Sequence, residues 1–246
     1  MQDLLIAIQF LTRIRFSNKI NYKPDSFAKS MVWFPVVGLI LGGILIISNY
    51  LLSYLFPLAI VNIFILIILI YLTQGIHLDG FADFIDGFYA SNEKQKILAV
   101  MRDSRVGSMG ALGLIILFLT KYLALTNLTV TTKIYALLLA PVLSRWMMVF
   151  ATVGSHYARE GDGLGKAFVE NNNYKIFLES SLIPVILSIT FFKLKSIFII
   201  GMVFIITGIL IRYIKKRIDG ITGDTLGAIN EIIEVAVLLF LQVGIK

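Results

Sequence analysis

Three aspartates with the spacing of one helical face are the strongest chemical signal in the sequence. Asp79, Asp83 and Asp86 occur at positions i, i+4 and i+7, which places their side chains within about 60° of one another on an α-helix. Like charges at this spacing destabilise an isolated helix by a few tenths of a kcal/mol per pair. Mg²⁺ or Mn²⁺ would relieve the repulsion, and either ion binds carboxylate oxygens together with substrate phosphate oxygens. These three aspartates, called the acidic stripe below, therefore predict a metal site for a phosphate-containing substrate.

Simpler interpretations of the same stretch stay open. The acids could be the solvated end of a helix, although such a face normally mixes both signs of charge and no Lys or Arg occurs between residues 57 and 93. His77 lies off the stripe, so a hydrogen bond at the membrane interface is favoured over metal ligation. Gly80 and Gly87 are poor helix residues that predict close approach of a ligand or a neighbouring helix, and Gly87 is a plausible helix stop.

A short basic segment follows the aspartates. Its polar residues and glycines are Arg102, Asp103, Ser104, Arg105, Gly107 and Gly110. The guanidinium group matches phosphate oxygens, and glycine-flanked amides at a helix N-terminus form an anion site. The segment therefore predicts a diphosphate clamp. The alternative is that the arginines only anchor the loop on the cytoplasmic side of a membrane.

A second acidic site is expected near the C-terminus. Thr222 or Asp224 could simply cap the last helix. Asp224 and Glu231 nevertheless lie seven residues apart on one face, and Asn230 and Glu234 continue that polar stripe into an apolar helix. Ionisable groups are costly in a bilayer and usually face a cavity or a partner. We therefore expect Asp224 to take part in the chemistry, whereas for Glu231 a structural role and a contribution to the site both stay open.

Charged residues also lie inside the apolar stretches. Arg145 and Glu234 are expected about 12 Å from the same membrane surface, eight residues along their helices. They predict either a buried ion pair or, for Arg145, a contact with a substrate phosphate. Lys121 lies past the middle of its helix and is expected to extend outward to the interface.

The elements that position these residues are membrane helices. Of the 246 residues, 58% are hydrophobic and 15% charged, against about 25% charged in an average soluble domain. This composition excludes a soluble enzyme and a nucleic-acid module, and the lack of cysteine excludes thiolate chemistry. Apolar runs of roughly 17–25 residues predict seven transmembrane helices, at 31–56, 58–73, 109–128, 134–153, 176–192, 197–214 and 226–245.

We expect an all-α integral membrane protein with one polytopic domain, 1–246. Residues 1–30 form an interfacial segment in which 4–16 is an amphipathic helix. Residues 74–108 form the cytoplasmic active-site loop, and its first part, 74–87, continues the second span as a helix. Fifteen loop Lys and Arg lie on one side of the seven spans and four on the other. The positive-inside rule therefore places the N-terminus and the acidic loops in the cytoplasm and the C-terminus outside.

Several segments in the correct order resemble one family. The segments 77–87, 101–107 and 222–228, together with the opening 4–15, are similar to cobalamin synthases, the adenosylcobinamide-GDP ribazoletransferases. The chain departs from the pattern at Arg102, where Lys is expected, and at Phe84, which is bulkier than usual. The resemblance covers most of the chain and carries several independent motifs.

The resemblance implies transfer of the adenosylcobinamide-phosphoryl group from adenosylcobinamide-GDP to α-ribazole or its 5'-phosphate, with release of GMP, at the cell membrane. It implies Mg²⁺, with Mn²⁺ as an alternative, on Asp79, Asp83 and Asp86. The expected catalytic residues are Asp83, Asp86 and Asp224. Asp224 would bind either a second metal or the attacking hydroxyl, and Asp86 and Asp224 are the candidate bases. The residues expected to bind substrate are Arg102, Asp103, Ser104, Arg105, Arg145, Thr222 and Glu231. A homo-oligomer and association with other corrinoid-assembly enzymes stay open, and no nucleic-acid partner is expected.

Other classes fit less well. Asp83, Asp86, Gly87 and Ala90 copy the first half of the CDP-alcohol phosphotransferase signature, but the following arginine and aspartates are missing. A membrane prenyltransferase would show two aspartate-rich loops related by a repeat. A secondary transporter would place its ionisable residues near the midplane, whereas most acids here lie at the inner boundary.

Overall fold

The computed structural model describes residues 2–15, 24–161 and 164–243. Within these ranges the regular secondary structure is helical, and one isolated bridge joins Tyr157 to Ile221. The expectation of an all-α protein is confirmed.

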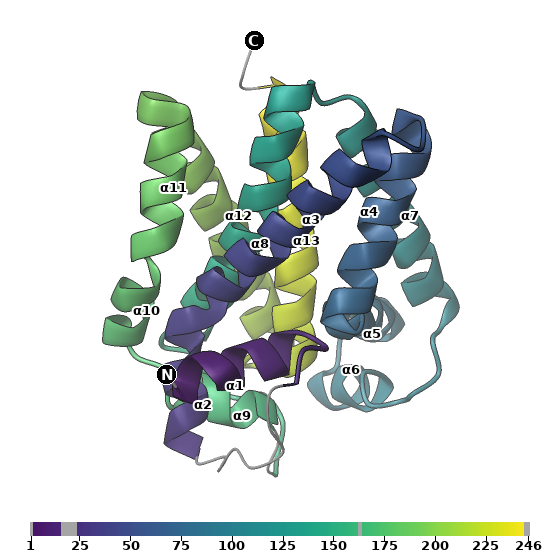
Figure 1. Ribbon diagram of the computed structural model, residues 1–246. Helices are drawn as coiled ribbons and strands as arrows, with labels where there is room; N and C mark the ends of the chain where they lie inside the picture. The colour runs from purple at the N-terminus through teal and green to yellow at the C-terminus, as the bar shows by residue number, and fades with distance from the viewer. Residues whose placement is uncertain (1, 16–23, 162–163, 244–246) are drawn as a thin grey trace.

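One set of helices runs side by side as a bundle, and the other helices gather mainly at one end of it (Figure 1). The bundle helices are α3 (Phe34–Ser53), α4 (Leu58–Thr73), α7 (Ser108–Thr126), α8 (Val130–Thr152), α11 (Leu182–Phe192), α12 (Ser196–Ile218) and α13 (Gly223–Val243). The remaining helices are α1 (Gln2–Leu11), α2 (Pro24–Ser30), α5 (Ile76–Ala90), α6 (Lys94–Val100), α9 (Leu164–Glu170) and α10 (Tyr174–Ser180). Two 3₁₀ turns, η1 (Met31–Trp33) and η2 (Lys193–Lys195), join neighbouring helices.

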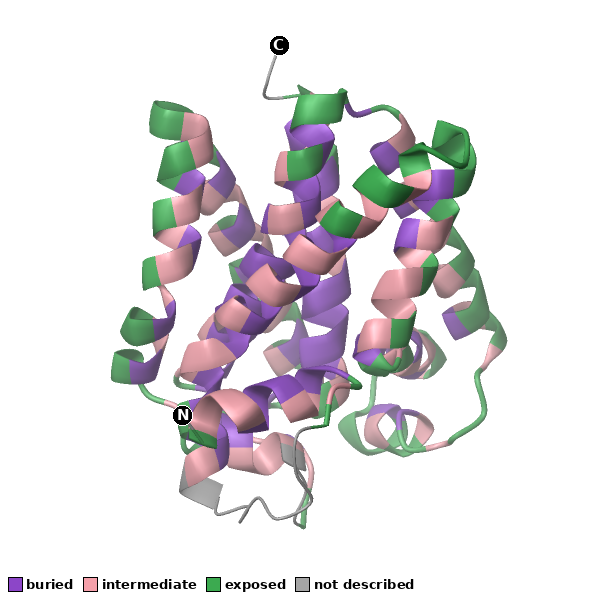
Figure 2. Cartoon of the chain, in the orientation of Figure 1, coloured by how far each residue is buried: buried purple, intermediate pink, exposed green. Residues whose placement is uncertain are grey.

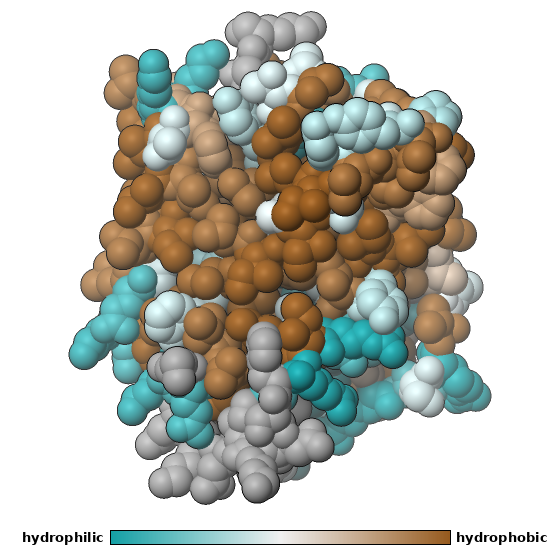
Figure 3. Space-filling model, in the orientation of Figure 1, coloured by the Kyte–Doolittle hydropathy of each residue, from teal (hydrophilic) through white to brown (hydrophobic). Residues whose placement is uncertain are grey.

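Apolar surface surrounds the middle of the bundle. Brown hydrophobic atoms form a broad belt between more polar ends (Figure 3), and the buried residues concentrate in α8 and α13 (Figure 2). The exposed side of the belt carries large apolar residues such as Ile67, Ile116 and Ile209. Single exposed apolar residues also occur on soluble proteins, but a continuous belt of them is typical of a surface that lipid surrounds. The molecule is a multi-pass membrane protein.

Five described stretches are long and apolar enough to cross a bilayer, and the bent pair of α4 and α5 would make a sixth. They are Ser26–Ser53, Ser108–Thr126, Val130–Thr152, Tyr174–Ile218 and Gly223–Val243. A straight helix of 45 residues, the length of the fourth, would measure about 68 Å, twice a hydrocarbon core of about 30 Å. This stretch instead contains α11, the turn η2 and α12, where two of the predicted spans lie. The number seven stays a prediction.

The first helix crosses one end of the bundle (Figure 1). It ends at Leu11, earlier than the predicted helix 4–16, whose last residue lies outside the described ranges. Phe10 packs on Phe34 of α3 and on Phe168 of α9. α13 ends at the opposite end of the bundle (Figure 1). Which end faces the cytoplasm stays a prediction.

The helix that carries the aspartates does not continue the second span, so that part of the expectation was wrong. The chain turns by 92° between α4 and α5. Gln74 and Gly75 both adopt the left-handed conformation, with φ of 57° and 67°, and the Gly75 amide bonds back to the Ile70 carbonyl. A glycine adopts this geometry without strain. The turn lays α5 across the end of the bundle.

Two glycines allow α5 to pack closely on its neighbours. A Cβ atom on Gly80 would lie 2.8 Å from the Cα of Asp224 at the start of α13. A Cβ atom on Gly87 would lie 3.1 Å from the Ile97 carbonyl oxygen of α6. Close approach to neighbouring helices is therefore confirmed, whereas a helix stop at Gly87 was wrong, because α5 continues to Ala90.

This packing predicts a glycine-specific effect on stability. Gly80→Ala should push α5 away from α13, because the Asp224 backbone cannot move aside as a side chain can, and overpacking of this kind costs about 1–3 kcal/mol. For a chain of this size 1 kcal/mol corresponds to about 2–4 °C in Tm. The measurement is the Tm of the detergent-purified protein.

Gly43→Ala in α3 is the matched control, since a Cβ atom there would meet nothing within 4 Å. It should leave Tm unchanged or slightly higher. Equal losses of Tm in the two variants would contradict the packing argument.

Candidate active site

Carboxylates from two helices converge at the crossing of α5 and α13. Asp79 is exposed on α5 and Asp83 is half-buried one turn further along, while Asp224 begins α13 opposite Gly80. Partial burial and the charges of Asp79 and Asp224 raise the pKa of Asp83 from its usual 3.8 to about 7. The repulsion predicted within the stripe is therefore present, and Asp224 adds to it.

These acids fit a divalent cation in their chemistry. Carboxylates that repel one another favour a bound cation, and Mg²⁺ commonly takes one or two carboxylates and completes its octahedron with water and substrate phosphate. Among the described residues no three acidic or histidine side chains are close enough together to hold one ion by themselves. Asp79 and Asp83 are the residues that would hold it, and phosphate oxygens would supply further ligands. The metal stays a prediction.

Asp86 differs from the other two acids of the stripe. Its two carboxylate oxygens accept hydrogen bonds of 2.8 Å from the amides of Gly107 and Gly110, at the N-terminus of α7. A Cβ atom on Gly107 would lie 2.5 Å from one of these oxygens, so the glycines make room for the carboxylate. The anion site that the sequence predicted for phosphate is thus occupied by Asp86, which anchors α7 to α5. Its metal and catalytic roles stay predictions.

The start of α13 is fixed by a reciprocal cap. The Thr225 amide donates to the Thr222 hydroxyl at 3.2 Å, and the Thr222 amide donates to the Thr225 hydroxyl at 2.9 Å. Thr222 is fully buried. The capping interpretation of Thr222 is therefore confirmed, and its predicted contact with substrate stays a prediction.

Arg159 is a site residue that the sequence reasoning missed. The Tyr157–Ile221 bridge holds the loop after α8 against the turn before α13, and Arg159 Nη2 donates to Asp224 Oδ2 at 2.5 Å. In the sequence, Arg159 was only one of several basic loop residues that set the topology. Its partner is 65 residues away, so no local spacing could have revealed it.

The basic segment forms the rim of the site. Arg105 pairs with Asp103 through Nη2–Oδ2 and Nε–Oδ1 contacts of 2.6 and 3.0 Å, and both residues lie in the loop with the exposed Ser104. These hydrogen bonds lower the pKa of Asp103 to about 2. Arg102 is exposed and its Nη2 lies 3.4 Å from the Glu160 carbonyl oxygen. Phosphate binding by either arginine stays a prediction.

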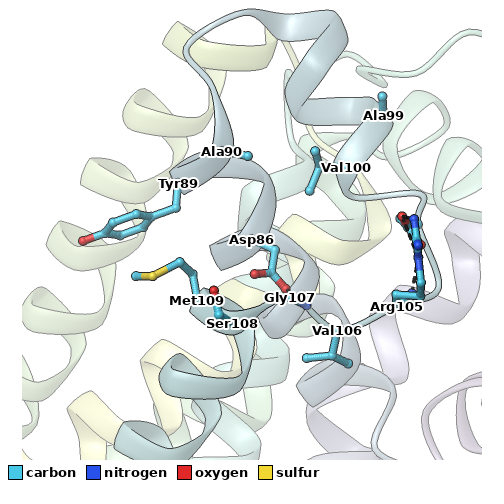
Figure 4. A pocket seen from close by; sticks show the side chains of 11 residues that line it. Asp86, Tyr89, Ala90, Ala99, Val100, Arg105, Val106, Gly107, Ser108 and Met109 are labelled. Atoms are coloured by element: carbon cyan, nitrogen blue, oxygen red, sulfur yellow. Dashed lines mark hydrogen bonds and ion pairs between the residues drawn. The ribbon is translucent and has the colours of Figure 1, made fainter.

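Two hollows border the acidic helix. A pocket of about 710 Å³ opens between α5, α6 and the start of α7, with Asp86, Tyr89 and Arg105 among its lining residues (Figure 4). A second hollow of about 540 Å³ lies beside Asp79. Val106 lines both. The stripe therefore has room beside it for a large substrate.

A buried ion network lies deeper in the bundle. Arg145 of α8 pairs with Glu234 of α13, which confirms the ion-pair interpretation. Lys121 of α7 lies 2.5 Å from Glu231 and 2.6 Å from Glu234. The expectation that Lys121 extends outward to the interface was wrong, because two carboxylates offer it a better environment than lipid. Predicted substrate contacts of Arg145 and Glu231 stay predictions.

His77 joins this network from α5. It is buried, and its Nδ1 lies 3.3 Å from Arg145 Nη2. This position agrees with a hydrogen-bonding histidine, although its partner lies inside the bundle and not at the membrane interface. The network therefore connects α5, α7, α8 and α13 beneath the acidic site.

The fold and the site define a helical, multi-pass membrane protein with converging carboxylates at one end, an arrangement suited to phosphate chemistry. The family model described as cobalamin-5-phosphate synthase matches residues 3–242. The chain belongs to this family and is a membrane transferase of cobalamin synthesis, as the resemblance implied.

Relatives named adenosylcobinamide-GDP ribazoletransferase match nearly end to end. The protein of Caldanaerobacter subterraneus subsp. tengcongensis is 37% identical, over 99% of this chain and 98% of its own length. The protein of Clostridium tetani is 37% identical, over 96% of this chain and 94% of its own length. The protein of Fusobacterium nucleatum is 36% identical, over 99% of this chain and 98% of its own length. No solved structure matches significantly.

The contacts of Asp86 predict a loss of stability that is independent of metal. Asp86→Ala leaves the Gly107 and Gly110 amides without their acceptor, and removing a helix cap costs about 0.5–2 kcal/mol. Tm measured in a chelating buffer should therefore fall, while Asp86→Asn, which keeps one acceptor oxygen, should lose less. An unchanged Tm for Asp86→Ala would show that Asp86 does not anchor α7.

The raised pKa of Asp83 predicts a stability difference with a defined pH dependence. The folded protein binds a proton on Asp83 below about pH 7, whereas the unfolded chain does so near its ordinary value. Without metal, the charged form therefore destabilises the fold above pH 7, and this cost is relieved as the pH falls towards 4. Asp83→Asn should raise Tm over the wild type at pH 8, and the gain should shrink through this window.

The matched control is Asp103→Asn, whose carboxyl has a pKa of about 2 through its hydrogen bonds with Arg105. Since that group favours its charged form, its substitution should bring no gain at pH 8. A gain in Tm for both variants would mean that the Asp83 effect reflects general loss of negative charge.

Proposed function

We propose that this enzyme transfers the adenosylcobinamide-phosphoryl group from adenosylcobinamide-GDP to the ribose hydroxyl of α-ribazole or α-ribazole 5'-phosphate and releases GMP. The observation that carries the proposal is the convergence of Asp79, Asp83 and Asp224 beside Arg159. The names of the relatives support the same donor substrate. Cleavage of a diphosphate requires positioning of the donor and stabilisation of negative charge on its phosphate oxygens.

The protein side chains divide these tasks by position. Asp79 and Asp83 would hold Mg²⁺, or Mn²⁺ in its place, and the bound ion would neutralise charge on the phosphate oxygens. Arg102 and Arg105, at the rim, contribute donors for the diphosphate. Asp224 lies on the opposite helix, close enough to Asp83 to raise its pKa, and would accept a proton from the attacking hydroxyl. Asp86 is the alternative base, with its oxygens already bonded to two amides.

The proposed location is the cell membrane, with the acidic site facing the cytoplasm. Most loop lysines and arginines lie on the same side as the acidic site, and the positive-inside rule identifies that side as cytoplasmic. GDP-linked and ribazole substrates are charged or strongly polar, so a site at the polar end of the bundle gives them access without crossing lipid.

The test is an assay of the purified protein with adenosylcobinamide-GDP and α-ribazole, with and without Mg²⁺, in which GMP and the corrinoid product are both quantified. The wild type should form equal amounts of the two products only with Mg²⁺ or Mn²⁺. Asp83→Asn should lower the rate at least about a hundredfold, since it removes a charge that acts directly on the reacting groups, while Tm shows that the variant is folded.

Two results would contradict the proposal. Product formation at the same rate in a chelating buffer would show that the reaction needs no metal. Full activity of Asp83→Asn would show that this acid has no role in catalysis. Uptake of corrinoid into vesicles without GMP release would instead favour a transporter.

A further inference from the structure

Arg159 reaches the acidic site from a loop far away in the sequence. Its side chain is 16% exposed and that of Asp224 22%. One Nη2 group donates both to Asp224 Oδ2, at 2.5 Å, and to the Met101 carbonyl, at 3.3 Å. The guanidinium group therefore lies between the start of α13 and the beginning of the basic segment.

The backbone around Arg159 is held firmly. The Ala158 amide donates to the Ile221 carbonyl at 3.0 Å, and the Ile221 amide donates to the His156 carbonyl at 2.8 Å. Gly220 has a φ of 154°, and a Cβ atom there would lie 2.9 Å from the Ala158 nitrogen. These contacts fix Arg159 relative to Asp224 before any ligand binds, and such preorganisation lowers the entropy cost of binding.

The guanidinium group has hydrogen-bonding capacity left over. Arg159 Nε is buried and has no hydrogen-bond partner within the part of the chain that the structure describes. An arginine presents five N–H donors in a planar fork, and only Nη2 is used in the contacts above. A buried donor without an acceptor is unfavourable, so the position favours an anion that arrives from outside the protein.

The surrounding charges define the kind of anion. Arg159 faces Asp224 and lies close enough to Asp83 to counter the repulsion from its acidic neighbours. A lone carboxylate ligand would only add to this negative charge. A phosphate can share a divalent cation with the acids, and that cation compensates the added negative charge. The planar guanidinium group of arginine matches the geometry of the phosphate oxygens.

We propose that Arg159 binds a non-bridging phosphate oxygen of the nucleoside diphosphate ester that this site cleaves, and is thus a substrate-binding residue beyond those expected from the sequence. The inference rests on the proposed function for the identity of that ester. In the ligand-free protein the ion pair with Asp224 holds the guanidinium group in place, and the free donors receive the phosphate.

The test is equilibrium binding of adenosylcobinamide-GDP to the full-length protein in detergent with Mg²⁺ and without a ribazole acceptor. Adenosylcobinamide, which has no nucleotide, is the comparison ligand. Arg159→Gln should weaken binding of the GDP derivative by about tenfold to a hundredfold, as loss of hydrogen bonds to a charged group does, and leave adenosylcobinamide unaffected. Arg159→Lys should recover part of the affinity.

Controls separate binding from folding. Lys96→Gln removes an equal charge from an exposed residue that pairs with Glu93 and should change neither affinity. If Arg159 served only to neutralise Asp224, the double variant Arg159→Gln/Asp224→Asn would regain wild-type affinity for the GDP derivative. Such recovery would overturn the proposal. So would binding of the GDP derivative by Arg159→Gln within twofold of the wild type, or an equal loss of affinity for both ligands.

These outcomes are distinct from failure of the proposed function. Normal turnover by the wild type together with normal binding by Arg159→Gln would contradict the role of Arg159 but not the proposed function. Arg159-dependent binding by a wild type that forms no corrinoid product would contradict the proposed function alone.

Discussion

The structure depends on a helix contact that leaves no room for a side chain. Gly80 of α5 lies directly against the backbone of Asp224 in α13, and this crossing brings acids from two helices together. Partial burial, together with the repulsion between these acids, raises the pKa of Asp83. Close packing of the two helix backbones offsets this unfavourable interaction, so the acids stay together and favour binding of a cation with its phosphate ligands.

The buried ion network maintains that crossing from below. Lys121 and Arg145 balance Glu231 and Glu234, so four ionisable side chains lie in the apolar bundle with compensated charge. Buried pairs of this kind contribute little net stability, but removing one partner is strongly destabilising. Since the two glutamates belong to α13, the network fixes the rotation of this helix and hence the direction in which Asp224 points.

Much of this arrangement could be predicted from local sequence. Periodic apolar runs predicted the helices, and the spacing of Asp79, Asp83 and Asp86 predicted a shared face. The 92° turn before that face could not be predicted with the same security, because Gln74 is not a residue that normally favours the left-handed conformation. The acceptor role of Asp86 was also hidden, since its amide partners are more than twenty residues away.

Contacts across the bundle account for the other differences. Lys121 finds Glu231 and Glu234 more than a hundred residues further along the chain, and Arg159 meets Asp224 only through the bridge between two loops. A single sequence shows such residues as isolated charges. The tertiary structure was needed to distinguish an anchor, a structural ion pair and a candidate ligand for phosphate.

Pulsed electron paramagnetic resonance of Mn²⁺ with the purified protein and adenosylcobinamide-GDP reports whether phosphorus nuclei lie next to the bound ion, and so tests the acidic site directly. One tightly bound Mn²⁺ should couple to the phosphorus of the diphosphate, and this signal should be lost in Asp83→Asn. Bound substrate with no Mn²⁺–phosphorus coupling, or an unchanged signal in that variant, would contradict a metal site at Asp79 and Asp83.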